Sequence, residues 1–234
     1  MKAVFRYVPA VALLAISAAA AAQGFRQVPE IDAFLRADTT EGASVIQSAD
    51  DPRIFEFSIP DAPKARAELR RASVSGALET MGGIFMLRDA AGDRLSIIQA
   101  LNVTEPGKPT GPSEPVAQLA IRKTGKVIDW KGNRRAEYAF YIEQAEGKPL
   151  CERMGTFAVG EPVVLAMQYR PGRHPVFIRD GDIAKICTGG KSNRLMGNPS
   201  GGGAGPFHFY GKLGVYKTSS GTGSARAVWA DIFD

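Results

Sequence analysis

The sequence has very few of the residues that build metal centres and disulfide-rich scaffolds. Its 234 residues include two cysteines and two histidines, His174 and His208. No His/Cys spacing resembles a structural zinc site, which excludes the common zinc-binding modules. We therefore expect no metal and no cofactor.

The N-terminal segment lacks acidic residues and has the pattern of a secretory signal peptide. Lys2 and Arg6 precede an uncharged run over residues 8–22, which closes on small alanines before Gln23. An uncleaved membrane anchor is the alternative, and the short, alanine-rich run disfavours it. We expect a signal peptide over residues 1–22 and a secreted or periplasmic protein.

Residues 23–234 are expected to form one domain, because about 210 residues suit a single sandwich or barrel. Removing Lys2 and Arg6 leaves 27 basic residues against 24 acidic ones, so the net charge falls from +5 to +3. The mature chain is therefore only mildly basic. We expect it to be a monomer that has no nucleic-acid partner and no membrane contact after signal cleavage.

Both cysteines lie in the exported part of the chain. In an oxidising compartment, a disulfide between Cys151 and Cys187 would close a loop of about 36 residues and stabilise the fold by about 3 to 4 kcal/mol. A catalytic cysteine is less well supported, because nothing near either residue supplies a dedicated base. We predict the disulfide.

No long amphipathic helical pattern and no internal repeat appear, whereas short strand patterns separated by turns recur. A single helical turn is expected over residues 30–36. The segments 83–87 and 94–103 are expected to pair as a hairpin. Two proline-rich or glycine-rich loops are expected at 105–115 and 188–206, the second as a mobile cover over a cleft. Further strands are expected at 53–59, 64–75, 116–122, 136–144, 163–169, 176–179, 207–217 and 225–233.

This pattern predicts an all-β fold, a concanavalin-like β-jelly-roll sandwich of two antiparallel sheets. Alternation assigns inner and outer faces to the strands. Residues Ala65, Ala67 and Leu69 point inward, as do Leu213 and Val215, while the polar residues between them point outward. On the strand 116–122, Gln118 and Arg122 take the polar side. On 94–103, Ile97, Gln99 and Leu101 are expected to share a face.

Three separated stretches resemble the signatures of polysaccharide lyase family 7, the alginate lyases. Residues 66–70, Arg-Ala-Glu-Leu-Arg, resemble the R-x-E-L-R signature. Residues 210–218 resemble Y-F-K-A-G-x-Y-x-Q, with Tyr210 at the first tyrosine. Residues 99–101, Gln-Ala-Leu, fall where the family has Q-I-H or Q-V-H. The resemblance implies a jelly roll that cleaves a polyuronate by β-elimination.

The chain departs from these signatures at four positions. Leu101 stands in the place of the family's histidine, which is assigned a part in proton abstraction. Gly211, Leu213 and Thr218 replace the motif's phenylalanine, alanine and final glutamine. These departures point away from guluronate-rich alginate, and an alginate-like or glucuronan-like polymer is expected instead.

A lyase acting on a polyuronate must remove the proton on C5 of the sugar, which is acidic only if the neighbouring carboxylate is neutralised. The expected catalytic residues are Arg66 and Gln99 at that carboxylate and Tyr216 as the proton donor to the leaving oxygen. Without a histidine, Tyr216 also becomes the candidate base, with Lys212 and Arg66 as the positive neighbours that a phenolate needs. The expected substrate-binding residues are Glu68, Arg70, Gln118, Arg122, His208, Tyr210 and Lys212.

Each of these residues also has a structural interpretation. Arg66, Glu68 and Arg70 could form a surface ladder of cross-strand ion pairs, and Gln99 could be a buried, satisfied amide. His208 fits the wall of a cleft better than a base, but strand alternation puts it on the face of Tyr216, so it is the reserve base.

Three functions follow from the sequence. The first is a polysaccharide lyase whose partner is an anionic polysaccharide. The alternative is a noncatalytic carbohydrate-binding jelly roll, because fold does not determine function. A glycoside hydrolase ranks last, because it needs two facing carboxylates and only Glu68 stands out.

Overall fold

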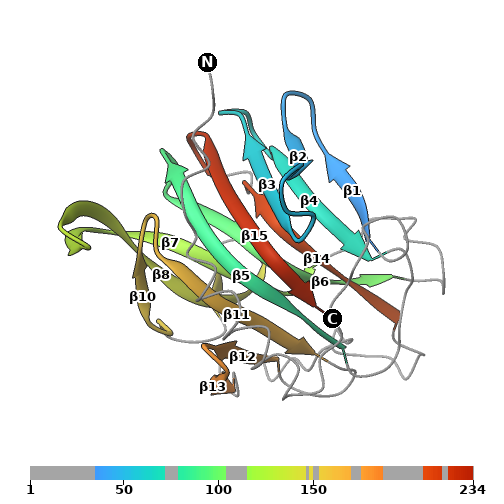
Figure 1. Cartoon of the computed structure of the whole chain (residues 1–234). Helices are drawn as coiled ribbons and strands as arrows, with labels where there is room; N and C mark the ends of the chain where they lie inside the picture. Colours follow the sequence, from blue (N-terminus) through green and yellow to red (C-terminus); the bar gives the residue numbers. More distant parts are fainter. Residues whose placement is uncertain are drawn as a thin grey trace.

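The computed structural model describes residues 35–71, 79–103, 115–145, 148–149, 153–169, 175–186, 208–217 and 221–233. Within these ranges the regular structure consists of strands arranged in two antiparallel sheets (Figure 1), so the predicted all-β jelly-roll sandwich is confirmed. No helix in the described part is long and apolar enough to cross a membrane. The predicted leader, the loop 188–206, His174 and the Cys151–Cys187 pair lie outside the described residues. So does the predicted loop 105–115, except for Pro115, which begins a strand.

One sheet, here called the site sheet, contains the strands that match the family signatures. Its order within the described ranges is β1 (Leu35–Thr39), β4 (Arg66–Arg71), β14 (His208–Tyr216), β6 (Arg94–Val103), β7 (Pro115–Trp130), β8 (Asn133–Ala145) and β10 (Thr156–Ala158), and β9 (Lys148–Pro149) pairs with β8. All of these pairs are antiparallel.

The second sheet covers the inner face of the site sheet. Its order is β13 (Asp182–Ile186), β12 (Val176–Arg179), β11 (Pro162–Tyr169), β5 (Glu79–Ala90), β15 (Ala225–Phe233), β3 (Ile54–Ile59) and β2 (Ser44–Gln47). The chain turns after β12 at Asp180 and Gly181, which both have positive φ.

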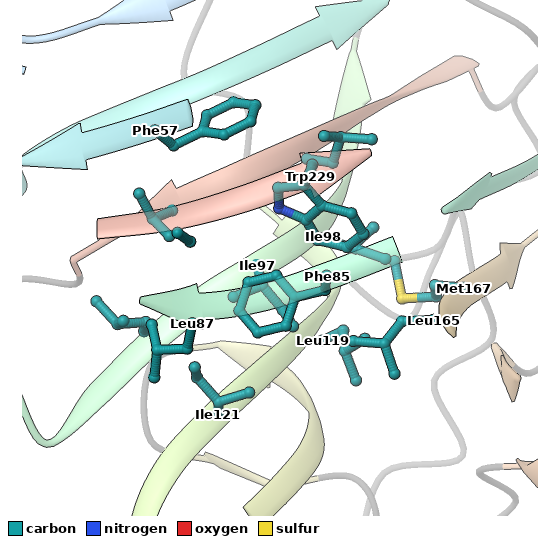
Figure 2. Close-up of a cluster of buried hydrophobic side chains, with 14 of the residues drawn as sticks. Phe57, Phe85, Leu87, Ile97, Ile98, Leu119, Ile121, Leu165, Met167 and Trp229 are labelled. Carbon is teal, nitrogen blue, oxygen red and sulfur yellow. The ribbon is translucent and has the colours of Figure 1, made fainter. Parts of the chain in front are cut away.

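The core lies between the sheets and is built from alternate residues of facing strands (Figure 2). Phe57 of β3, Phe85 of β5 and Trp229 of β15 are fully buried, and the ring centroids of Phe85 and Trp229 lie 5.0 Å apart. The indole Nε1 of Trp229 donates a hydrogen bond to the carbonyl of Gly214 at 3.3 Å, which ties the second sheet to β14. The inward positions predicted for Ala65, Ala67, Leu69, Leu213 and Val215 are confirmed.

Two local predictions are wrong because the pairing involves distant strands. Of the helical turn predicted over 30–36, the structure describes Leu35 and Arg36. These two residues belong to β1, because their backbone groups pair with β4. Strands β5 and β6 do not form a hairpin, because the chain crosses between sheets after Ala90 and places the two strands on opposite sides of the core.

A β-bulge on β6 corrects a third prediction. The register with β7 shifts between Ser96 and Ile98, so Ile97 and Ile98 both pack into the core. Ile97 therefore does not share a face with Gln99, as alternation alone predicts. The extra residue returns Gln99 to the outer face of the site sheet, where it bonds to Glu68.

Candidate functional site

A row of polar residues crosses the outer face of the site sheet. Lys212 of β14 lies opposite Arg70 of β4 and Gln99 of β6. Gln99 in turn lies opposite Gln118 of β7, which lies opposite Glu143 of β8. Directly paired residues point to the same side of a sheet, so five neighbouring strands contribute to one polar row.

A second row lies beside it and contains the two residues to which most of the chemistry was assigned. Tyr216 of β14 pairs with Arg66 of β4. The guanidinium carbon of Arg66 is 5.3 Å from the centroid of the Tyr216 ring, in a cation–π contact. The register thus places Arg66, Arg70, Gln99, Lys212 and Tyr216 on one face.

The Lys212 ammonium holds two carboxylates together at the edge of this face. Its Nζ lies 2.6 Å from Oδ2 of Asp38 and 3.6 Å from Oε2 of Glu68. Asp38 also receives a hydrogen bond from Arg66 at 3.4 Å. Partial burial would raise the pKa of Asp38, but the hydrogen bond and charge of Lys212, with a smaller contribution from Arg66, lower it below the ordinary value.

Glu68 is the buried member of this ion-pair group, with only 2% of its surface exposed. Its Oε1 accepts a hydrogen bond from Nε2 of Gln99, whereas its Oε2 has no hydrogen-bond partner. Burial raises the pKa of Glu68 above the ordinary value, although Lys212 and Arg66 act in the opposite direction. The cross-strand ion pairs and the buried Gln99 amide are thus both present in the structure.

This raised pKa predicts how Glu68→Gln changes stability with pH. A carboxyl group whose folded pKa is raised contributes most to stability below its unfolded pKa of about 4.3, and that contribution is lost as the pH rises through the folded pKa. The advantage of the wild type over Glu68→Gln in unfolding free energy should therefore shrink as the pH rises from about 4. Chemical denaturation of both proteins at a series of pH values measures this difference in unfolding free energy.

Asp38→Asn is the matched control for that experiment, because the folded pKa of Asp38 is lowered. The contribution of Asp38 to stability is present above the unfolded pKa and is lost as the pH falls. The advantage of the wild type over Asp38→Asn in unfolding free energy should therefore increase with rising pH. An advantage over Glu68→Gln that grows with pH would contradict the assignment, since it would mean that Lys212 and Arg66 outweigh the burial of Glu68.

The position of the missing motif histidine is filled by an apolar contact. Leu101 lies opposite Tyr210 across β6 and β14, and the two side chains form a small buried cluster. Tyr210 is only 4% exposed, and the Lys212 ammonium lies 5.9 Å from its ring centroid. Tyr210 therefore covers Leu101 in this structure. His208 takes the register position opposite Val103, at the start of β14.

A second ion-pair cluster occupies the same face on β6, β7 and β8. Glu143 is fully buried and accepts hydrogen bonds from Nε of Arg94 at 3.0 Å and from Nε of Arg122 at 2.9 Å. The Arg122 guanidinium also stacks on Tyr141, at 5.0 Å from the ring centroid. Beside this cluster, Gln118 is fully buried and neither of its amide atoms has a hydrogen-bond partner. Of the predicted pair, Gln118 thus belongs to the row of Gln99, and Arg122 lies on the same face four residues further along β7.

Sequence reasoning missed four residues of this face. Asp38 lies before the first strand that the sequence predicts, and only its pairing with Glu68 across β1 and β4 reveals it. Arg94, Tyr141 and Glu143 lie on strands that were predicted, and alternation from Gln118 and Arg122 could have indicated the residues on β8. In the described ranges, no group of three or more His, Cys, Asp or Glu residues is arranged to hold a metal ion.

No protein-family model and no curated protein matches this chain. Among solved structures, the fold is similar to an alginate lyase from Pseudomonas aeruginosa, with 14% identity, a TM-score of 0.53, and coverage of 82% of this chain and 86% of that chain. It is also similar to an alginate lyase from Alteromonas sp. 272, with 10% identity, a TM-score of 0.51, and coverage of 88% and 97%. A looser likeness is to the carbohydrate recognition domain of Emp47p, with 10% identity, a TM-score of 0.42, and coverage of 88% and 90%.

These likenesses identify the fold. The chain is a β-jelly-roll sandwich of the kind found in alginate lyases, with the candidate site on the outer face of one sheet.

Proposed function

We propose that this protein is a secreted or periplasmic polysaccharide lyase, related to family 7, that cleaves an alginate-like or glucuronan-like polyuronate by β-elimination. The observation that carries the proposal is the contact between Arg66 and Tyr216, 5.3 Å from guanidinium carbon to ring centroid, beside the row of Lys212 and Gln99. This arrangement combines a donor for a carboxylate with a phenol that can exchange protons.

Arg66 is the residue that meets the uronate carboxylate in this mechanism. Its side chain is about one-third exposed (32%). The Nε is buried and lies 4.0 Å from Oε2 of Glu68, so the terminal nitrogens of the guanidinium are the donors that a carboxylate would meet. Gln99 assists, since an amide nitrogen carries two N–H donors and Glu68 accepts one of them. Together they withdraw charge from the carboxylate, which makes the C5 proton more acidic and stabilises the enolate that forms on its loss.

Tyr216 exchanges the protons. Its phenolate form takes the C5 proton, and the resulting phenol protonates the glycosidic oxygen as the bond from that oxygen to C4 breaks. Tyr216 is then a phenolate again, so one residue both accepts and donates the proton. The Arg66 guanidinium beside the ring supplies the positive charge that a phenolate requires. The products are a shortened chain and an unsaturated uronate.

The experiment that tests the function is a screen of polyuronates followed by ultraviolet absorbance. Alginate blocks, glucuronan and glycosaminoglycans are incubated with the full chain, and the unsaturated product of elimination absorbs in the ultraviolet. Rising absorbance with one substrate would support the lyase and identify its polymer. No rise with any of them, together with measurable binding, would overturn the proposal.

Arg66→Ala is expected to weaken substrate binding and turnover together. The guanidinium meets the carboxylate both in the bound substrate and in the transition state, so its loss raises KM and lowers kcat. Removing one charge-assisted contact should cost about 1.5 to 3 kcal/mol in kcat/KM, or roughly 10-fold to 150-fold. Steady-state kinetics on the substrate found in the screen measures both constants. A change in kcat with unchanged KM would contradict the assigned role.

A noncatalytic carbohydrate-binding protein is the second candidate, and Leu101 is the observation that favours it. This position holds an apolar side chain, 5% exposed and packed against Tyr210, where the family motif has a histidine. The polyuronate screen separates the two functions, because a binding protein retains the polymer without generating the unsaturated product.

The described carboxylates do not favour hydrolysis. Glycosidases place two carboxyl groups about 5 to 10 Å apart on either side of the sugar. Glu68 on β4 and Glu143 on β8 are separated by four strand spacings, about 19 Å. Asp38 and Glu68 are closer, but both contact the Lys212 ammonium, which occupies the space between them.

A further inference from the structure

The ends of β7 and β8 form a hairpin, residues 123–136, that none of the proposed chemistry uses. Its ladder runs from Val127 opposite Ala136 to Trp130 opposite Asn133, and the chain turns at Lys131 and Gly132. Figure 1 shows it as the curved arm at the left, reaching away from the rest of the two sheets. With about seven residues on each side, the arm is roughly 20 Å long.

This hairpin concentrates the positive charge of the protein. It contains five cationic residues, Lys123, Lys126, Lys131, Arg134 and Arg135, and one acidic residue, Asp129. Its net charge is therefore +4, compared with +5 for the whole chain of 234 residues. The remaining residues carry a net charge of +1, so most of the excess positive charge of the chain lies in this hairpin.

The cations of the hairpin are available to a ligand. All five are exposed, and in the described part of the chain none of them forms an ion pair with a carboxylate. Asp129 is used locally, since its Oδ1 accepts the backbone N–H of Gly132 in the turn. At the base of the arm, Glu137 is bound by Thr124 and by Arg153 instead.

Apolar side chains lie on both faces of the hairpin, because Val127 and Trp130 are three positions apart on β7 and point to opposite sides. Val127 is 54% exposed, which makes it one of two large exposed hydrophobic residues in the described ranges. Trp130 is half-buried, and the Lys131 ammonium stacks at 4.8 Å from its ring centroid. An acidic polysaccharide presents carboxylates alternating with apolar C–H faces of the sugar rings. On one face of the hairpin, the Trp130 ring with Lys131 against it and with Arg135 on the same side offers a partner for both.

We infer that the hairpin 123–136 is a second docking site for the anionic polysaccharide, which holds a long chain while one segment of it occupies the candidate site. This inference rests on the proposed function for the identity of the polymer. The hairpin is continuous with the site face, because β7 and β8 themselves carry Gln118, Arg122 and Tyr141 of that face. A polymer that crosses the site sheet from β4 toward β8 and continues along these strands reaches the hairpin next.

The experiment compares two variants of equal net charge. The hairpin variant combines Lys123→Gln, Lys126→Gln, Arg134→Gln and Arg135→Gln. The control variant combines Arg53→Gln, Lys64→Gln, Arg88→Gln and Arg226→Gln, which are exposed cations away from the arm. Thermal unfolding first establishes that both are folded. Binding of long alginate, long glucuronan and the corresponding tetrasaccharides is then measured by calorimetry, in a Tyr216→Phe background so that cleavage is slow.

The hairpin variant should bind the long polymer that the wild type prefers about 10-fold to 100-fold more weakly, since four rim charge contacts are removed. Its affinity for the tetrasaccharide should stay within about twofold, because a short chain fills the site alone. The salt dependence of long-chain binding should also become shallower, as fewer counterions are released.

Three results would overturn the inference. The control variant could lose long-chain affinity equally, which would show an effect of net charge only. The hairpin variant could bind the long polymer as the wild type does. Double-stranded DNA or anionic vesicles could bind the arm more tightly than any polyuronate, which would assign a different partner. Since binding needs no turnover, a protein that binds long chains through the arm but cleaves nothing would remove the lyase function and leave this inference standing.

Discussion

Replacing Tyr216 by phenylalanine is expected to lower turnover on the cleaved polyuronate by about 100-fold to 10,000-fold, with little change in substrate binding. The substitution removes one oxygen and leaves the ring beneath Arg66, so the cation–π contact at 5.3 Å can persist. The loss should therefore appear in kcat and not in KM, because general acid and base work belongs to the transition state.

Tyr141→Phe is the matched control for that measurement. Tyr141 lies in the same row of the site sheet as Tyr216, because Tyr216 pairs with Ser96, Ser96 with Ala120, and Ala120 with Tyr141. It also lies beneath an arginine, since the Arg122 guanidinium is 5.0 Å from its ring centroid. The same chemical change there should leave kcat nearly unchanged. An equal loss in both variants would mean that any phenol on this face affects turnover.

His208→Ala is measured beside these two variants, because His208 is the reserve base. If Tyr216→Phe keeps near-normal kcat while His208→Ala is inactive, then the imidazole does the work of the missing motif histidine. The role assigned to Tyr216 would then be wrong.

Positions along a single strand could be predicted from the sequence, because the two-residue period of side chains is a local property. Arg66, Lys212 and Tyr216 take the outward positions that alternation predicts. The fold class followed from the same information, since many short alternating segments and no helical period leave few architectures other than a sandwich.

Pairing between distant strands could not be predicted in this way. Asp38 contacts Lys212 although 174 positions separate them, and no local pattern marks that contact. The bulge at Ile97 is also invisible to alternation, because it depends on how β6 registers against β7. Gln99 reaches the site face because of that bulge, whereas its predicted place depended on the family resemblance.

The polar contacts could not be predicted for a related reason. The sequence treats Glu68 and Gln99 as separate candidates, 31 positions apart, whereas the structure joins them by a hydrogen bond. The consequence is chemical, since the amide that was expected to serve only the substrate also holds a buried carboxyl group in place.

The tightest backbone approach beside the site occurs at Gly214, between Lys212 and Tyr216. This glycine has a φ of +149° and lies opposite Glu68. A Cβ built there would lie 2.3 Å from the carbonyl oxygen of Ala67 and 2.8 Å from the Cα of Glu68. Both are backbone atoms of β4, so the contact cannot be relieved by rotating a side chain.

Gly214→Ala is therefore expected to destabilise the protein by about 3 to 5 kcal/mol, the sum of backbone strain and overpacking. The displacement of β4 also moves Arg66 away from Tyr216, so any folded fraction should show reduced turnover. Gly125→Ala separates the two causes, because Gly125 has a φ of +81° and no atom within 4 Å of the added Cβ. That control should lose about 1 to 2 kcal/mol, from backbone strain alone. Denaturant unfolding of both variants measures the difference, and a loss at Gly214 no larger than the loss at Gly125 would show that β4 can move aside without cost.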